Sequence, residues 1–123
     1  MAAPNILNVS SIVGMTTSLN LSTDTATTFL SNADSSNKVF RINSITGVNY
    51  SGVSVDLTLK LHQSAAGAGT SVPIISTVVI PTSASVIVVG KDNPIYLEEN
   101  RSLSAQASAT DSIAIVCSYE EVS

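Results

Sequence analysis

The most regular pattern along the chain is an alternation of apolar and polar residues over residues 53–61. Every odd position there is apolar and every even position is polar, as in Val55, Asp56 and Leu57. A repeat of two residues is typical of a β-strand with one buried face, because successive side chains of a strand point to opposite sides. The same pattern over residues 102–107 and 112–119 predicts two further strands.

Six weaker segments are rich in β-branched or aromatic residues and are bounded by turn-forming residues, so we expect strands there too. They are residues 16–22, 25–31, 38–48, 74–80, 85–89 and 95–98. No window shows a sustained helical period. The sequence therefore predicts an all-β protein, an antiparallel β-sandwich of jelly-roll type, with immunoglobulin-like connectivity as the alternative.

The N-terminal part of the chain has a less regular pattern, in which apolar residues are interrupted by Asn and Ser. Such a segment is either an ordinary edge strand or an arm that packs on its own domain or on a neighbouring copy, because large exposed apolar patches are rare in monomers. We divide the chain into this N-terminal strand or arm, residues 1–22, and a β-sandwich domain, residues 23–123. A loop tyrosine can also anchor an interface. The candidate interface residues are Ile6, Leu7, Val9, Ile12, Val13, Met15 and Tyr50.

Charge is sparse in this chain. Five Lys and Arg residues against nine Asp and Glu residues give a net charge of −4. Without a basic face to release counterions from a phosphate backbone, we expect no nucleic-acid binding. Residues 63–90 carry no charge, but Pro73, Pro81 and the polar break at residues 82–85 fit two short strands and a turn better than a membrane span. We expect no membrane association.

Groups that carry catalysis are few. The chain has one His, His62, and one Cys, Cys117. His62 falls on the polar face of its strand, about 20 Å along an extended chain from Asp56, which is too far for a hydrogen bond. Cys117 alternates with residues that we expect in the core, where a thiol is inert. We therefore expect no enzyme activity, cofactor or metal site; an enzyme would have to use His62 or Cys117.

Three stretches of the chain resemble one family of proteins. They are residues 38–45 (KVFRINSI), 91–100 (KDNPIYLEEN) and 116–123 (VCSYEEVS). These stretches are similar to the small β-rich virion proteins of tailed phages that infect marine cyanobacteria, and the likeness covers about residues 38–123. The loop at residues 64–72 departs from the family pattern because it is longer. The resemblance implies a noncatalytic particle component, found in the virion after synthesis in the host cytoplasm.

Together these patterns favour a structural function. A compact sandwich with a hydroxyl-rich surface and few charges can sit at high density on a symmetric shell without strong repulsion. We expect a capsid decoration or cement protein that forms a homo-oligomer, such as a trimer, and binds the major capsid protein. The alternative is a neck, tail or fibre component that binds a neck or tail protein and touches a host surface glycan through residues 50–52 and 64–72.

Overall fold

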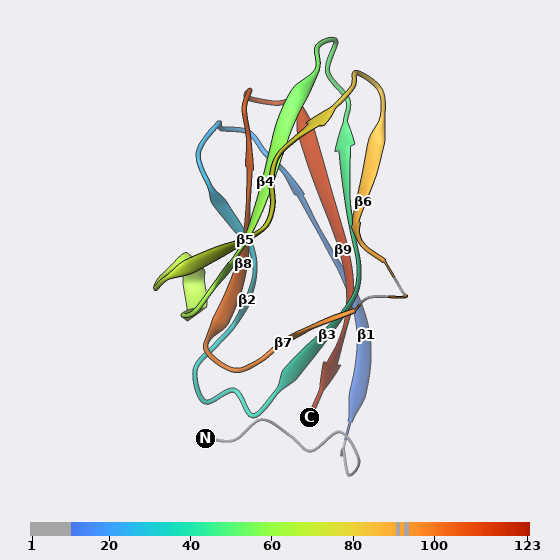
Figure 1. Ribbon diagram of the computed structural model, residues 1–123. Coiled ribbons are helices and arrows are strands. Elements are labelled where there is room, and N and C mark those ends of the chain that lie inside the picture. The colour runs from blue at the N-terminus through green and yellow to red at the C-terminus, as the bar shows by residue number, and fades with distance from the viewer. Residues whose placement is uncertain (1–10, 91, 93) are drawn as a thin grey trace.

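The computed structural model describes residues 11–90, 92 and 94–123, which form nine strands and one short 3-10 turn, η1 (Ala65–Gly67) (Figure 1). Among the residues described, no helix has the length and apolar character needed to cross a membrane. The strands are β1 (Ile12–Asn20), β2 (Thr27–Asn32), β3 (Val39–Asn49), β4 (Val55–His62), β5 (Ser71–Ile80), β6 (Ser85–Val89), β7 (Ile95–Leu97), β8 (Arg101–Ala107) and β9 (Ile113–Val122).

The strands form two antiparallel sheets, which we name after a central strand of each. The β9 sheet has the order β1-β9-β3-β6, with β7 also paired to β3, and the β8 sheet has the order β2-β8-β4-β5. Strands from the first half of the chain thus run beside strands from the second half, β1 with β9, β2 with β8, β3 with β6 and β4 with β5. A long antiparallel hairpin rolled in this way is a jelly roll, so the predicted fold is confirmed.

The immunoglobulin-like alternative does not fit this connectivity. Within the described part of the chain, β4 and β5 are the only sequence neighbours that pair with each other. An immunoglobulin sandwich pairs several sequence neighbours within its two sheets.

The core lies between the two sheets, and the alternating segments build it. Leu57 and Leu59 of β4 and Leu103 of β8 are fully buried. On β9, Ile115 and Cys117 are fully buried as well, on the face that the alternation predicts. Each large aliphatic side chain removed from water in this way stabilises the fold by about 2 kcal/mol.

The outer face of the β8 sheet is more buried than the alternation predicts. Ser102 and Ser104 lie on the polar side of β8, yet both are buried. The loop that contains η1 folds back onto this face, where the Gly67 amide donates to Ser102 Oγ at 2.8 Å and that hydroxyl donates to the Ser64 carbonyl at 2.8 Å. Gly67 has a φ of 74°, which glycine adopts without strain.

Two buried asparagines connect the sheets near opposite ends of β3. Asn32 ends β2 in the β8 sheet, and its amide donates to the Leu97 carbonyl of β7 at 3.0 Å. Asn49 ends β3 in the β9 sheet, and its amide donates to the Ile80 carbonyl of β5 at 2.9 Å. Both side chains are fully buried, so these bonds are formed away from water.

Candidate functional site

The free edge of β1 is the feature of this fold that is best suited to contact another chain. Within the described residues, β1 pairs only with β9. Ser11 and Ser123 exchange two backbone hydrogen bonds at 2.9 Å, and the Leu21 amide donates to the Ile113 carbonyl. Backbone groups of an antiparallel strand alternate between its two sides, so the odd residues of β1 face β9. The N–H and C=O groups of its even residues therefore face outward.

The β1 edge also exposes apolar side chains. Ile12, Val13 and Met15 are 56%, 50% and 41% exposed. The strand IVGMTTSLN carries no charge and no proline. A long, regular and apolar edge is a template for pairing with another strand.

The other sheet edges are protected by features that β1 lacks. The pairing of β5 with β4 is interrupted by two register shifts, and β5 contains Pro73. The pairing of β2 with β8 is shifted between Thr28 and Leu30, and the pairing of β6 with β3 is shifted between Ile45 and Thr46. Bulges and edge prolines are common ways to block edge-to-edge association. The remaining edge strand, β7, pairs with β3 without a shift but over only three residues. Among the edge strands described, β1 therefore has the longest uninterrupted register.

The structure brings together only part of the predicted interface. Ile12, Val13 and Met15 lie along one end of β1. Tyr50 is 50% exposed. It directly follows β3, whose last residue, Asn49, pairs with Ile113 at the start of β9. Tyr50 therefore lies at the end of the β9 sheet opposite to Ile12. Three further predicted interface residues lie outside the described residues: Ile6, Leu7 and Val9.

A second exposed apolar area crosses the outer face of the β9 sheet. The register places Ile87 of β6 beside Thr46 of β3, then Val116 of β9 and Ser18 of β1. Ile87 is 69% exposed and Val116 is 40% exposed. This row reaches β1 at Ser18, where the polar Thr46 and Ser18 alternate with the two apolar residues.

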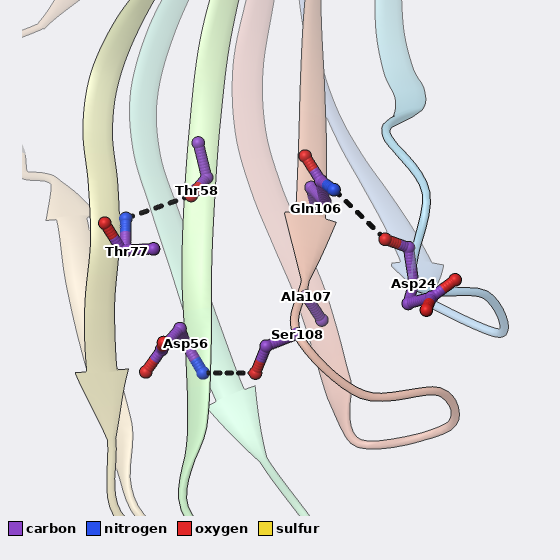
Figure 2. A pocket seen from close by; sticks show the side chains of 7 residues that line it. All are labelled: Asp24, Asp56, Thr58, Thr77, Gln106, Ala107 and Ser108. Carbon is purple, nitrogen blue, oxygen red and sulfur yellow. Dashed lines mark hydrogen bonds between the residues drawn. The ribbon is translucent and has the colours of Figure 1, made fainter.

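A shallow groove lies on the outer side of the β8 sheet, where polar side chains of several segments meet (Figure 2). Its volume is about 320 Å³, and the groups that line it come from Asp24, Asp56, Thr58, Thr77, Gln106, Ala107 and Ser108. Gln106 donates to the Asp24 carbonyl at 3.1 Å, and the Thr77 amide donates to Thr58 Oγ1 at 2.9 Å. The groove offers hydroxyl, amide and carboxylate groups, which suit hydrogen bonding to a polar ligand. No sequence pattern indicated it, because its residues come from four separate segments.

His62 lies apart from this groove, on the polar face of β4, and is only partly exposed. Its Nε2 atom lies 2.6 Å from Ser104 Oγ, while its Nδ1 atom is buried without a partner among the described residues. A serine–histidine pair needs a third group that orients the imidazole and a substrate site beside the hydroxyl. Ser104 itself is only 3% exposed, which leaves no such access.

Cys117 is fully buried between the sheets. Burial raises the pKa of this thiol from 9.0 to about 12. A thiol of that kind remains protonated at neutral pH and is a poor nucleophile. Among the residues described, no three His, Cys, Asp or Glu side chains gather as a metal site would require.

Comparisons with known proteins identify the fold and no family. No family model matches the chain, and no curated protein does. A chain of the Bacillus endospore appendages, described as a novel family of disulfide-linked pili, superposes with a TM-score of 0.55 at 15% sequence identity. That match covers 92% of this chain and 88% of the pilus chain. A chain of infectious bursal disease virus, Gt strain, gives a TM-score of 0.44 at 9% identity and covers 93% of this chain and 31% of the viral one.

Proposed function

We propose that this protein is a non-enzymatic structural subunit that works by packing against copies of itself and against neighbouring proteins of a particle. The observation that carries the proposal is the β1 edge, whose register is uninterrupted and whose apolar side chains are exposed. Contiguous apolar surface of this kind marks contacts between proteins.

The particle that we propose is the virion of a tailed phage, with the chain as a decoration or cement protein on the capsid. The resemblance of residues 38–123 to small phage virion proteins supports this role. The shared fold with a pilus chain agrees with it, since a jelly roll can be used as a repeating subunit. Fold alone does not assign function, so the phage role depends on the resemblance.

Assembly by this chain would be noncovalent. The pilus chains are described as disulfide-linked. Here the single cysteine, Cys117, is fully buried and its pKa is raised to about 12, so it is not presented to a neighbouring copy. Contact between subunits would then depend on strand edges and apolar faces.

The proposal is tested by binding to empty phage heads. The purified chain should co-sediment saturably with empty heads that lack it and should raise the temperature at which those heads disassemble. Native virions serve as the matched control, because sites that are already filled should bind no added chain. Failure to bind empty heads would contradict the decoration role.

The second candidate is a neck, tail or fibre component that binds a host glycan, and the groove of Figure 2 favours it. Hydroxyl, amide and carboxylate groups in one groove are suited to sugar hydroxyls. The two segments predicted for this role, residues 50–52 and 64–72, do not form one surface, because the first precedes β4 and the second follows it. A glycan array tests this candidate. Loss of binding in Asp56→Asn, with binding kept in Tyr50→Ala, would place the ligand in the groove. The reverse result would place it at the loop that contains Tyr50.

A further inference from the structure

We propose that two copies of this chain pair through their β1 edges about a twofold axis at Thr16, so that the two β9 sheets become one continuous antiparallel sheet. This inference rests on the proposed structural function and names both the partner, a second copy, and the contact. A twofold contact uses the same surface on both copies, so one free edge is enough to form it.

The backbone geometry of β1 is self-complementary about Thr16. The even residues of β1 present their N–H and C=O groups away from β9. A twofold axis at Thr16 sets Thr16 opposite itself and Gly14 opposite Ser18. It also sets Ile12 opposite Asn20. Every outward-facing residue of the strand thus meets another outward-facing residue, with which it can exchange two hydrogen bonds.

The side chains fit the same register. Residues facing each other between the hydrogen-bonded pairs bring their side chains closest together. The axis at Thr16 makes Val13 face Leu19, and Met15 face Thr17, each on the other copy. Val13 and Met15 are exposed in the single chain, and Leu19 is partly buried against the core. The pairing therefore covers apolar surface that is exposed to water in the monomer.

Electrostatics does not oppose the contact. No residue of β1 is charged. The nearest acidic side chains on β9 are Glu120 and Glu121, which pair with Gly14 and Val13. Across the axis, Gly14 meets Ser18 of the second copy and Val13 meets its Leu19. On β9 of the second copy, these two residues pair with Val116 and Ile115, which are uncharged. No like charges face each other, although the chain carries a net charge of −4.

The other edges are poor partners for β1, which is why we choose a second β1. A ring or filament would require β1 of one copy to meet a different edge of the next copy. Within the described chain those edges are β2, β5, β6 and β7. The pairing of the first three is interrupted by a register shift, and β7 is only three residues long. A regular strand of nine residues is matched in length and register by another β1.

The first test removes the central hydrogen bonds without disturbing the fold. Thr16 is exposed and its N–H faces away from β9, so Thr16→Pro removes no hydrogen bond formed among residues 11–90, 92 and 94–123. The wild type should sediment with twice the 12.7 kDa mass of the chain. Thr16→Pro should raise the dissociation constant of the dimer at least about tenfold, because it deletes a donor and blocks the approach of the second strand. Thr16→Val, which keeps the N–H, should remain dimeric.

The second test checks the register and the symmetry. Because Thr16 faces itself across the axis, Thr16→Lys and Thr16→Glu should each be largely monomeric at low salt, owing to like-charge repulsion. A mixture of the two variants should form heterodimers, detectable by native mass spectrometry. A contact between β1 and a different edge gives no such rescue.

The outcomes separate this inference from the proposed function. A monomeric or trimeric wild type, a dimer unaffected by Thr16→Pro, or charged variants that do not pair with each other would overturn the β1 contact. Binding to empty heads by a chain that fails these tests would leave the decoration role standing. A dimer that behaves as described and ignores empty heads would overturn the decoration role and keep the β1 contact.

Discussion

The side chain of Asn49 is fully buried and takes part in four hydrogen bonds. Its amide donates to the carbonyls of Val53 and Ile80, and its oxygen accepts from the amide and the hydroxyl of Ser51. One residue thus fixes the turn after β3 and joins the β9 sheet to β5 of the β8 sheet. Buried polar groups stabilise a fold only when all of them are satisfied.

Replacing this residue should therefore lower stability more than replacing a partly exposed asparagine of the same strand. We expect Asn49→Ala to lower the free energy of unfolding by about 2–3 kcal/mol, because buried carbonyl groups lose their donor. Asn43 also lies on β3 but is only half-buried and bonds to Glu120 at 3.1 Å. Asn43→Ala should cost less than about 1 kcal/mol in the same urea titration. Equal losses for the two variants would contradict the role given to Asn49.

Cys117 makes the stability of the protein depend on pH in the alkaline range. Its pKa is about 12 in the folded chain because of burial, against 9.0 for an ordinary thiol. Between these two values the unfolded chain loses the thiol proton while the folded chain keeps it. The contribution of this thiol to the free energy of unfolding is therefore fully present below about pH 9. Above that pH it falls by about 1.4 kcal/mol per pH unit.

This prediction is checked by urea unfolding at several pH values between 8 and 11, comparing the wild type with Cys117→Ala. The free energy of unfolding of the variant should be lower by a constant amount, because the substitution leaves a small cavity. Above pH 9 it should also fall less steeply than that of the wild type. Tyr119, whose pKa is raised first by burial and then by Glu121 and Cys117, contributes a decline of the same sign to both proteins. Parallel curves over the whole range would rule out the effect assigned to the thiol.

At the scale of the strand, Gly47 of β3 lies close against Leu57 of β4 in the other sheet. A Cβ atom at this position would lie 2.7 Å from Leu57 Cδ2 and within 3.7 Å of the Ile80 and Ile115 side chains. Leu57 is fully buried, so its side chain has little room to move away. Gly47 thus sets how closely the two sheets can pack at that level.

Gly47→Val should lower the free energy of unfolding by about 1–3 kcal/mol through overpacking. Gly14 on β1 is the matched control, because a Cβ there meets no atom within 4 Å. Gly14→Val should change stability by no more than about 0.5 kcal/mol and can raise it slightly, since valine suits a strand better than glycine. Thermal unfolding of both variants gives the comparison, and a Gly14→Val loss as large as that of Gly47→Val would count against the close approach.

Alternation along the sequence was enough to predict β4, β8 and β9, because the period of two is a local property. The other strands were predicted from composition and turn residues, and the first of them, expected at residues 16–22, begins earlier, at Ile12. Residues 53–61 and 112–119 correspond to β4 and β9, with the expected faces buried except at Val53, which precedes β4 and is 61% exposed. The burial of Ser102 and Ser104 could not be predicted in this way. It depends on the loop from Ser64 folding back onto β8, which is a contact between distant parts of the chain.

The candidate interface was predictable only in part for the same reason. The exposed apolar residues Ile12, Val13 and Met15 were visible as an irregular apolar segment. That β1 is a free edge, and that its register is uninterrupted, follows from its pairing with β9 and from the bulges of the other edges. Neither is encoded in a local pattern. Likewise, the position of Tyr50 at the far end of the sheet follows from the register of β3.

For the molecule as a whole, the rolled hairpin places one core between two sheets. The buried cluster takes residues from both sheets, including Ile42 and Ile115 from the β9 sheet and Leu59 and Leu103 from the β8 sheet. Neither sheet has a separate core, and Asn32 and Asn49 join the sheets near both ends. The sandwich should therefore unfold as a single cooperative unit.

Native-state hydrogen exchange tests this cooperativity strand by strand. β8 lies between β2 and β4, and β9 lies between β1 and β3, so both are central strands of their sheets. Their slowest amides should exchange with the same free energy, equal to that of global unfolding in urea, because either strand can open fully only when the shared core is lost. Amides of the edge strands β5 and β6 should exchange through smaller openings. The result would be contradicted by an opening free energy for the slowest amides of β8 that is more than about 1 kcal/mol below that of β9. In that case the two sheets would be separate folding units, and the shared core would not make the jelly roll cooperative.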